Sequence, residues 1–162
     1  MEFKIATIRD APQIREVYNE HILRGGSTMD QTPKSLSEIE DWFHSFSNRE
    51  LIVLLEIDER LVGWGIIKRY SDRLGYARAC ETAIYLKSGE LRKGYGTAIK
   101  KWIIKKCKEL DYHHLVAKIF SSNTASIEYN KRLGYELVGT QREIGYINGQ
   151  WQDVTIMQLI LY

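Results

Sequence analysis

Residues 91–97, Leu91-Arg92-Lys93-Gly94-Tyr95-Gly96-Thr97, stand between a strand-like run and a long helical pattern. Two glycines one residue apart allow the backbone to come close to a ligand, and the start of the next helix offers unpaired N–H groups and a partial positive charge. This combination suits a diphosphate group. The spacing matches neither a Walker loop nor the dinucleotide-binding G-x-G-x-x-G, because Ile99 takes the place of the third glycine. A tight strand-to-helix turn without a ligand is the alternative interpretation.

The length and charge of the chain bound its class. A chain of 162 residues is long enough for one core, and no linker or repeat divides it, so we expect a single domain over residues 1–162. A net charge of +2 does not indicate nucleic-acid binding. The lysines of the long helical pattern are expected to form a solvated helix face. They are Lys100, Lys101, Lys105, Lys106 and Lys108.

The cysteines and the N-terminus point to a reducing compartment. Cys80 and Cys107 have no paired spacing, and no histidine pattern lies near them, so we expect neither a disulfide nor a metal site. The chain begins without the apolar core of a signal peptide, and no apolar run is long enough to span a bilayer. We therefore expect a cytoplasmic protein that binds no membrane.

Apolar periodicity predicts the element order β-α-α-β-β-β-α-β-α-β-β, a mixed α/β fold with helices on the faces of one sheet. Apparent capping boxes at Asp10–Gln13 and Ser35–Glu38 precede the first two helices. Asn148-Gly149 predicts a tight hairpin turn near the C-terminus. Before this hairpin, strands are expected at residues 3–8, 51–57, 61–70, 81–87 and 115–120.

The order of these elements limits the topology. Three consecutive strands before the glycine stretch are typical of an antiparallel meander, whereas the strand–helix–strand unit over residues 80–120 requires one parallel pair. The sheet should therefore be mostly antiparallel. Ligands of open sheets tend to bind beyond the carboxyl ends of parallel strands. We expect the site at the end of the 81–87 strand.

Two motifs together resemble the GNAT superfamily of N-acetyltransferases over nearly the whole chain. They are Arg92-Lys93-Gly94-Tyr95-Gly96 and the segment that begins Asn123-Thr124-Ala125-Ser126 and ends Leu133-Gly134-Tyr135. Further segments are similar to the phosphinothricin acetyltransferase-like branch. These are Arg73-x-x-Tyr76, Glu81-Thr-Ala-Ile-Tyr-Leu86, Tyr18-Asn19-Glu20-His21-Ile22 and residues 145–154.

The resemblance implies acetyl-CoA as the acetyl donor. It implies that the backbone of Ile84, Tyr85 and Leu86 pairs with the pantetheine arm like an added strand. The amide of Leu86 would polarise the thioester carbonyl. The loop from Arg92 to Thr97 would hold the diphosphate, and Asn123 would reach the pantetheine arm, although it also fits a plain helix cap. The binding residues of the loop are Arg92, Lys93, Gly94, Tyr95, Gly96 and Thr97.

The chain departs from the family pattern at two positions. Leu91 stands where Arg or Gln is usual. Asn130 stands where many members have a tyrosine, and the phosphinothricin-like branch often a histidine, as the acid for the departing thiolate. The neighbouring Tyr129 would point about 100° away around the helix, which makes it a poor substitute. The thiolate acid is therefore unassigned.

Glu81 is the candidate catalytic base. Acetyl transfer needs a neutral amine, and a carboxylate early in the strand that holds the thioester can accept the proton directly or through water. The alternative is that Glu81 only pairs with Arg73, Arg78 or a lysine. Arg73 and Tyr76 precede Glu81 and are candidates for orienting an acidic acceptor, since arginine binds carboxylates through two parallel bonds. Both could equally be plain surface residues.

We therefore predict direct transfer from acetyl-CoA to the primary amine of a small amino-acid-like acceptor, such as phosphinothricin or methionine sulfoximine. One alternative is a peptide or protein N-acetyltransferase, which would have an open acidic groove. Another is a non-catalytic acyl-CoA-binding sensor, to which Asn130 lends some support. A nucleic-acid partner is not expected, because aromatic residues do not alternate with the lysines. Homodimers are common in the family, but nothing in the sequence decides this.

Overall fold

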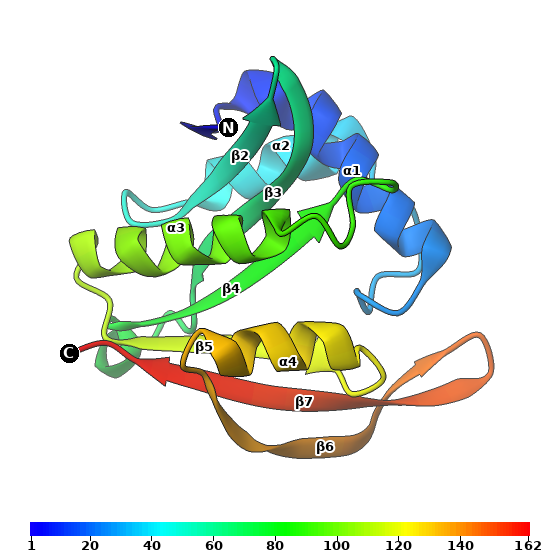
Figure 1. The fold of residues 1–162 in the computed structure, drawn as a ribbon, viewed down its shortest axis with the longest axis vertical. Coiled ribbons are helices and arrows are strands. Elements are labelled where there is room, and N and C mark those ends of the chain that lie inside the picture. The colour runs from blue at the N-terminus through cyan, green and yellow to red at the C-terminus, as the bar shows by residue number, and fades with distance from the viewer.

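One seven-stranded sheet in the order β1-β2-β3-β4-β5-β7-β6 runs through this computed structural model, which describes all of residues 1–162 (Figure 1). Every strand pairing is antiparallel except that of β4 with β5, which is parallel. The expected element order and single parallel pair are therefore confirmed. The elements are β1 Glu2–Ile5, α1 Ala11–Arg24, α2 Leu36–Ser45, β2 Leu51–Ile57, β3 Arg60–Arg69, β4 Ala79–Leu86, α3 Tyr95–Glu109, β5 His114–Phe120, α4 Thr124–Arg132, β6 Glu136–Ile147 and β7 Gln150–Ile160.

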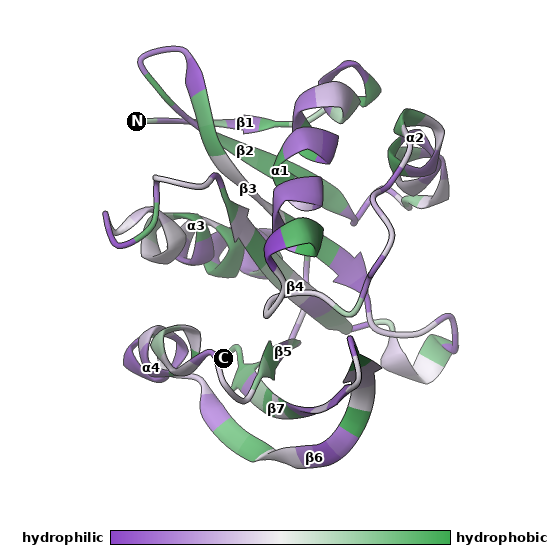
Figure 2. Ribbon diagram, turned by 90° about the vertical axis from the view of Figure 1, so that its right-hand side faces the viewer, coloured by the Kyte–Doolittle hydropathy of each residue, from purple (hydrophilic) through white to green (hydrophobic).

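Helices cover both faces of the sheet, and each face has its own apolar cluster. Figure 2 shows α1 and α2 on one side of the strands and α3 and α4 on the other. On the first face, Ile14 and Val17 of α1 pack against the fully buried Trp64 of β3. On the second face, Ile99 and Ile103 of α3 pack into the larger cluster. None of the helices has the length and apolar character needed to cross a bilayer.

β4 and β5 separate after a short parallel contact. Their register covers only Ala79–Glu81 of β4, although β4 continues to Leu86, and Figure 1 shows the two strands diverging toward one side of the molecule. The backbone groups of Ala79 and Lys87, at the two ends of β4, bond to β3. Because backbone groups alternate in direction along a strand, Thr82, Ile84 and Leu86 direct theirs toward the gap.

The helix and turn signals are partly confirmed. The Ser35–Glu38 capping box forms, with Glu38 N donating to Ser35 Oγ at 3.2 Å and Ser35 N donating to Glu38 Oε1 at 3.4 Å. The turn at Asn148 and Gly149 has positive φ at both residues, as a primed turn requires. Asp10 is the N-cap of α1 as expected, but the box with Gln13 does not form, because the Asp10 carboxylate accepts the Thr7 N–H at 2.8 Å and the Gln13 side-chain Nε2 at 3.0 Å instead of a backbone N–H of the helix. The first strand ends at Ile5 rather than Ile8.

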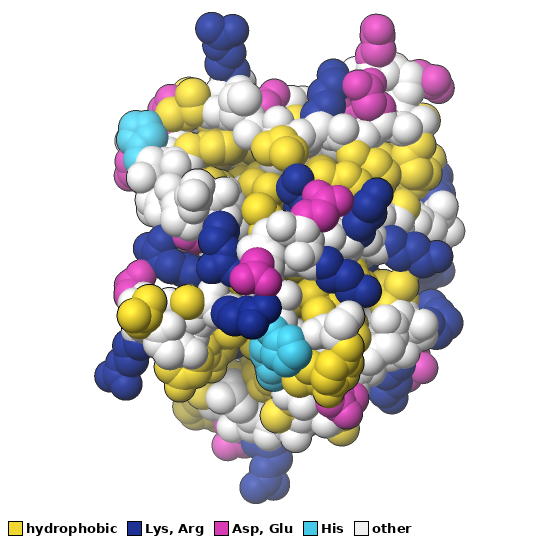
Figure 3. Space-filling model, turned by 90° about the vertical axis from the view of Figure 1, so that its left-hand side faces the viewer, with side chains coloured by type: hydrophobic (Ala, Val, Ile, Leu, Met, Phe, Trp, Pro, Cys, Tyr) yellow, Lys and Arg dark blue, Asp and Glu magenta, His cyan; other side chains and the backbone are white.

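One expectation about the α3 face is also corrected. Lys100 is not on a solvated face, because it is only 2% exposed, whereas Lys101, Lys105 and Lys108 are exposed. Basic side chains on the face where α3 ends are scattered among acidic and apolar ones (Figure 3). The sulfur atoms of the two buried cysteines, Cys80 and Cys107, lie 3.7 Å apart as free thiols, a contact that their sequence spacing does not reveal.

Candidate active site

Three connected cavities follow the gap between β4 and β5. The first, of about 580 Å³, lies between residues 91–97, the loop after α1 and α4, and we call it the loop cavity. The second, of about 70 Å³, lies in the gap itself and is the strand-gap cavity. The third, of about 410 Å³, opens on the α1–α2 face and is the Glu81 cavity. The first two share Ile84, Asn123 and Tyr129, and the last two share Thr82 and Tyr85, so the three adjoin one another in this order, and we call the series the path.

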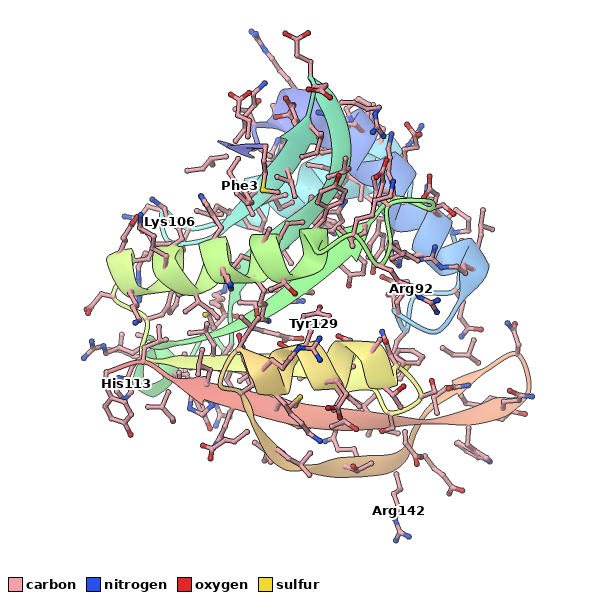
Figure 4. The ribbon with its side chains drawn as sticks, in the orientation of Figure 1. Phe3, Arg92, Lys106, His113, Tyr129 and Arg142 are labelled. Atoms are coloured by element: carbon pink, nitrogen blue, oxygen red, sulfur yellow. The ribbon has the colours of Figure 1, made fainter.

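The glycine stretch forms the entrance of this path. Arg92, Gly94, Gly96 and Thr97 line the loop cavity. Arg92 adopts a left-handed φ of 63°, and Figure 4 shows its side chain reaching from the loop toward the opening beside α4. The side chains of the other two predicted binding residues of the loop, Lys93 and Tyr95, do not line this cavity. Lys93 pairs with Glu90 at 3.1 Å, and Tyr95 packs against the core.

The two glycines have different reasons to be glycine. Gly94 caps α3 at a φ of 83°, a conformation that side-chain-bearing residues adopt at a cost. Gly96 needs no special φ, and an added Cβ would meet only Leu86 Cδ1, at an ordinary 3.7 Å. Nothing inside the protein therefore excludes a side chain at position 96. A Cβ there would instead narrow the loop cavity.

Backbone groups of β4 without a partner strand face the gap, and one of them, the Leu86 carbonyl, is held by a histidine side chain. The N–H groups of Ile84 and Leu86 face the gap, as the prediction of an added strand requires. Tyr85 contributes its side chain to the cavities instead, because its backbone is turned toward β3. His21 Nε2 donates to the Leu86 carbonyl at 2.8 Å, and its Nδ1 bonds to Ser27 Oγ at 2.7 Å. Burial lowers the pKa of His21, so the ring stays neutral and orders the end of β4.

Asn123 caps the start of α4, and Asn130 lies within its last turn. Asn123 Oδ1 accepts the Ser126 N–H at 3.2 Å, so Asn123 is a helix cap, and it also lines both the loop and the strand-gap cavities. Asn130 is 2% exposed, and its Nδ2 donates to the Ser126 carbonyl at 2.8 Å. Asn130 Oδ1 is buried without a partner. Such an orphaned acceptor in a cavity wall fits a polar ligand group.

Tyr129 is better placed than the helical angle suggested. It lines the loop and strand-gap cavities together with Asn123, and Figure 4 shows it on the side of α4 that faces α3. Asn130 also lines the strand-gap cavity, so these two neighbouring positions reach the same space. Burial raises the pKa of Tyr129, which makes its hydroxyl a weaker acid than an exposed tyrosine.

Glu81 lies at the end of the path that is far from the glycine stretch, in the Glu81 cavity. Its side chain is 21% exposed, and Lys118 Nζ lies 3.6 Å from its carboxylate. Glu81 therefore does have a basic partner, though neither Arg73 nor Arg78. Both partners of this ion pair line the cavity, so Glu81 can contact Lys118 and a bound amine at the same time.

Aromatic residues line the wall of the Glu81 cavity, together with two further acids, Asp30 and Glu50. Trp42 and Phe46 line it, so they are cavity wall as well as core. The Tyr18 hydroxyl donates to the Asp30 carboxylate and shares a 2.8 Å hydrogen bond with Thr28 Oγ1. Burial is the main reason that the pKa of Tyr18 is raised, with Asp30 adding to it. This network fixes Asp30 at the cavity, and the sequence contained no motif that indicated it.

Basic residues share this cavity with the three acids Glu81, Asp30 and Glu50. Arg69 is fully engaged, because its guanidinium donates to Glu50 at 2.7 Å and pairs with Asp72 at 2.6 Å. Burial alone would raise the pKa of Glu50, but hydrogen bonds from backbone N–H groups and Arg69 outweigh it and lower that pKa. Lys68, opposite Glu81 in the β3–β4 register, has no acidic partner.

Arg73 and Tyr76 lie apart from Glu81. Arg73 precedes a short 3-10 turn and lines neither the Glu81 cavity nor its neighbour. Tyr76 is 47% exposed, stacks on Tyr70 at 5.2 Å between ring centroids, and lines a separate cavity that shares Lys118 with the Glu81 cavity. The structure therefore does not bring these two residues together with Glu81 into one cavity. Their role in orienting the acceptor stays a prediction.

The fold and the path through it identify the class of protein. A family model described as "Acetyltransferase (GNAT) domain" matches residues 3–156. The chain therefore belongs to the GNAT acetyltransferase family and is an acetyltransferase. The resemblance predicted from the two motifs is confirmed.

Particular relatives narrow this class. The chain is 28% identical over 158 residues to an L-methionine sulfoximine/L-methionine sulfone acetyltransferase of Pseudomonas paraeruginosa, covering 96% of this chain and 92% of the relative. It is 25% identical to a phosphinothricin N-acetyltransferase of Alcaligenes faecalis, covering 92% and 77% of the two chains. A solved phosphinothricin acetyltransferase from Sinorhizobium meliloti in complex with acetyl-CoA has a TM-score of 0.93 at 28% identity, covering 99% of this chain and 88% of that one.

Proposed function

We propose that the protein transfers an acetyl group from acetyl-CoA directly to the primary amine of a small amino-acid-like acceptor. The observation that carries this proposal is the single path from the glycine loop to Glu81, in which the last two cavities meet at Thr82 and Tyr85. Relatives named for methionine sulfoximine and phosphinothricin support the acceptor class. A solved neighbour complexed with acetyl-CoA supports the donor.

The residues of the path fit an acetyl-CoA molecule. The loop cavity combines the start of α3 with Arg92, which suits a diphosphate. The gap-facing backbone of Ile84 and Leu86 suits the amides of a pantetheine arm, and Asn123 stands opposite. Acetyl-CoA supplies an activated acyl carbon when bound. The Leu86 N–H is the donor that we assign to the thioester carbonyl oxygen.

The Glu81 cavity fits an acceptor that carries both charges. Glu81 takes a proton from the acceptor ammonium or from the attacking amine, directly or through water. Asp30 lies in the same cavity and attracts the ammonium. Lys68, without an acidic partner, is the group that we assign to the acceptor's carboxylate. The aromatic wall of Trp42 and Phe46 covers the acceptor's apolar part.

A thiol-release assay with acetyl-CoA tests this function. The amine panel contains phosphinothricin, methionine sulfoximine, methionine sulfone, polyamines and short peptides. We expect release with the first three compounds and little with the others. Release with peptides alone would favour a peptide or protein acetyltransferase, and acetyl-CoA binding without release from any amine would favour a sensor. Either result would contradict the proposal.

A further inference from the structure

Lys100 is a buried cation that the function described so far does not use. It lies in α3 with 2% of its surface exposed. Its Nζ donates to Thr82 Oγ1 at 2.8 Å and lies 4.6 Å from the centroid of the Tyr135 ring, with no carboxylate as an ion-pair partner. Burying an ammonium without a counter-charge is costly. Such a group at a cavity is a candidate for a functional role.

The groups around Lys100 leave it an unusually ready proton donor. The titratable side chains nearest to it are Cys80 on β4, Cys107 on α3 and Tyr135 after α4, all neutral in their ordinary state. Tyr85 on β4, Tyr129 on α4 and Lys118 on β5, which pairs with Glu81, line the same strand-gap cavity. Burial lowers the pKa of Lys100 to about 8, although the two thiols oppose this shift. The ammonium is therefore mostly protonated near neutral pH, yet more acidic than an ordinary lysine.

The position of Lys100 along the path is specific. Lys100 and Thr82 line the strand-gap cavity, and Thr82 also lines the Glu81 cavity. Tyr129 lies at the opposite end, where the strand-gap cavity meets the loop cavity. A thioester that reaches Glu81 from the loop therefore comes closest to Lys100 with its reacting end. Asn130, across the gap, is an amide and has no proton to give at neutral pH.

We propose that Lys100 is the acid that protonates the sulfur of the departing coenzyme A, with Thr82 orienting the ammonium. The inference rests on the proposed function. The acceptor nitrogen bonds to the acyl carbon while the carbon–sulfur bond breaks, and the sulfur takes a proton from Lys100 Nζ. The surplus proton of the acceptor nitrogen passes to Glu81. Afterwards solvent returns a proton to Lys100 and receives one from Glu81, so the products are the amide and the free thiol.

A titration of bound coenzyme A tests whether Lys100 faces the sulfur without any turnover. Thiolate absorbance is followed between about pH 6 and 10 for the wild type, Lys100→Met and the control Lys101→Met, an exposed neighbour on the same helix. An adjacent ammonium favours the thiolate, so the thiol pKa should be lower by about one unit in the wild type and control than in Lys100→Met. Equal thiol pKa values in all three would overturn the proposal.

Turnover gives the second readout. In Lys100→Met, kcat should fall roughly 10- to 100-fold while KM for acetyl-CoA stays unchanged. The wild-type kcat should fall above about pH 8, as the acid loses its proton, and this fall should disappear in the variant. Tyr129→Phe is the rival variant. If it removes the alkaline fall and Lys100→Met does not, the proposal is wrong.

A second variant covers the case in which Lys100→Met is unstable. If Lys100→Met fails to fold, Thr82→Val replaces it. This variant keeps the ammonium but removes its hydrogen-bond partner, so it should raise the thiol pKa and lower kcat by smaller amounts; no change in either would count against Lys100. If the wild type binds coenzyme A but acetylates no amine, the proposed function fails, while the thiol titration still decides whether Lys100 faces the sulfur.

Discussion

On the face that carries α3 and α4, the path is lined by β4, the glycine stretch at 91–97, the end of α1 with the loop after it, the second half of β5, and α4 with its cap. On the face that carries α1 and α2, the Glu81 cavity is lined by side chains from α1, α2, β3, β4 and β5 and from the loop between the two helices. The first half of the site is made by short continuous segments, and the second by residues distant in sequence. The proposed donor site can therefore be predicted from motifs, whereas the proposed acceptor site depends on how the helices pack.

The largest effect on kcat should come from a substitution at Glu81, in the β4 strand that lines both the strand-gap cavity and the Glu81 cavity. Glu81→Gln removes the base while keeping the shape of the side chain, so kcat should fall about 10²- to 10³-fold with the affinity for acetyl-CoA unchanged. Steady-state kinetics and calorimetry with acetyl-CoA measure the two quantities. The exposed Glu109→Gln is the matched control. A parallel loss of acetyl-CoA binding would mean that the two halves are not separable at Glu81.

The buried lysine predicts a distinctive pH dependence of stability. The pKa of Lys100 is about 8 in the folded protein and about 10.4 in an unfolded chain. Between these values the unfolded state binds more protons, so stability rises with pH in this window, whereas below it the buried charge is a constant burden. Relative to Lys100→Met, the wild type should gain about 3 kcal/mol across the window.

Urea unfolding of both proteins at a series of pH values measures this difference. The comparison with Lys100→Met cancels the other titrating groups, since they are common to both chains. A difference in unfolding free energy that stays flat with pH would show that the ammonium is not buried as described.

The acceptor half should respond to a change at Lys68. Lys68→Met removes the cation without an acidic partner, so KM for an amino-acid acceptor should rise about tenfold, which is the strength of one charge-assisted bond. KM for the same acceptor without its carboxylate should not change. Steady-state kinetics with the matched pair of acceptors tests this. An equal rise for both compounds would place the carboxylate elsewhere in the cavity.

The smallest effect should be confined to the donor half. Gly96→Ala adds a methyl group that the protein itself accommodates, so the free energy of unfolding should change by less than about 1 kcal/mol. The affinity for acetyl-CoA should nevertheless fall roughly tenfold, because the methyl group projects into the loop cavity. Calorimetry measures the affinity, and urea unfolding provides the control. Unchanged affinity would leave the glycine without a role in donor binding.

The features that could be predicted from the sequence are those that a single short segment encodes. The apolar periods fixed the element order, and Asn148-Gly149 and Ser35–Glu38 formed the expected turn and cap. Which residues line the Glu81 cavity could not be predicted from their distance along the chain. Arg73 is near Glu81 in sequence but outside its cavity, whereas Asp30 is far away in sequence and inside it. Side chains cross between elements, so their meeting points depend on packing.

The sequence by itself determined the fold, the family and the position of the glycine stretch at 91–97, because hydrophobic periods and glycine positions act over a few neighbouring residues. Only the tertiary structure decided that Lys100 is buried against Thr82 and that Lys118 pairs with Glu81. A lysine in a helical pattern reads as solvent-exposed whichever face it occupies. Its burial follows from how α3 packs over β4, and that packing is set by contacts across the whole sheet.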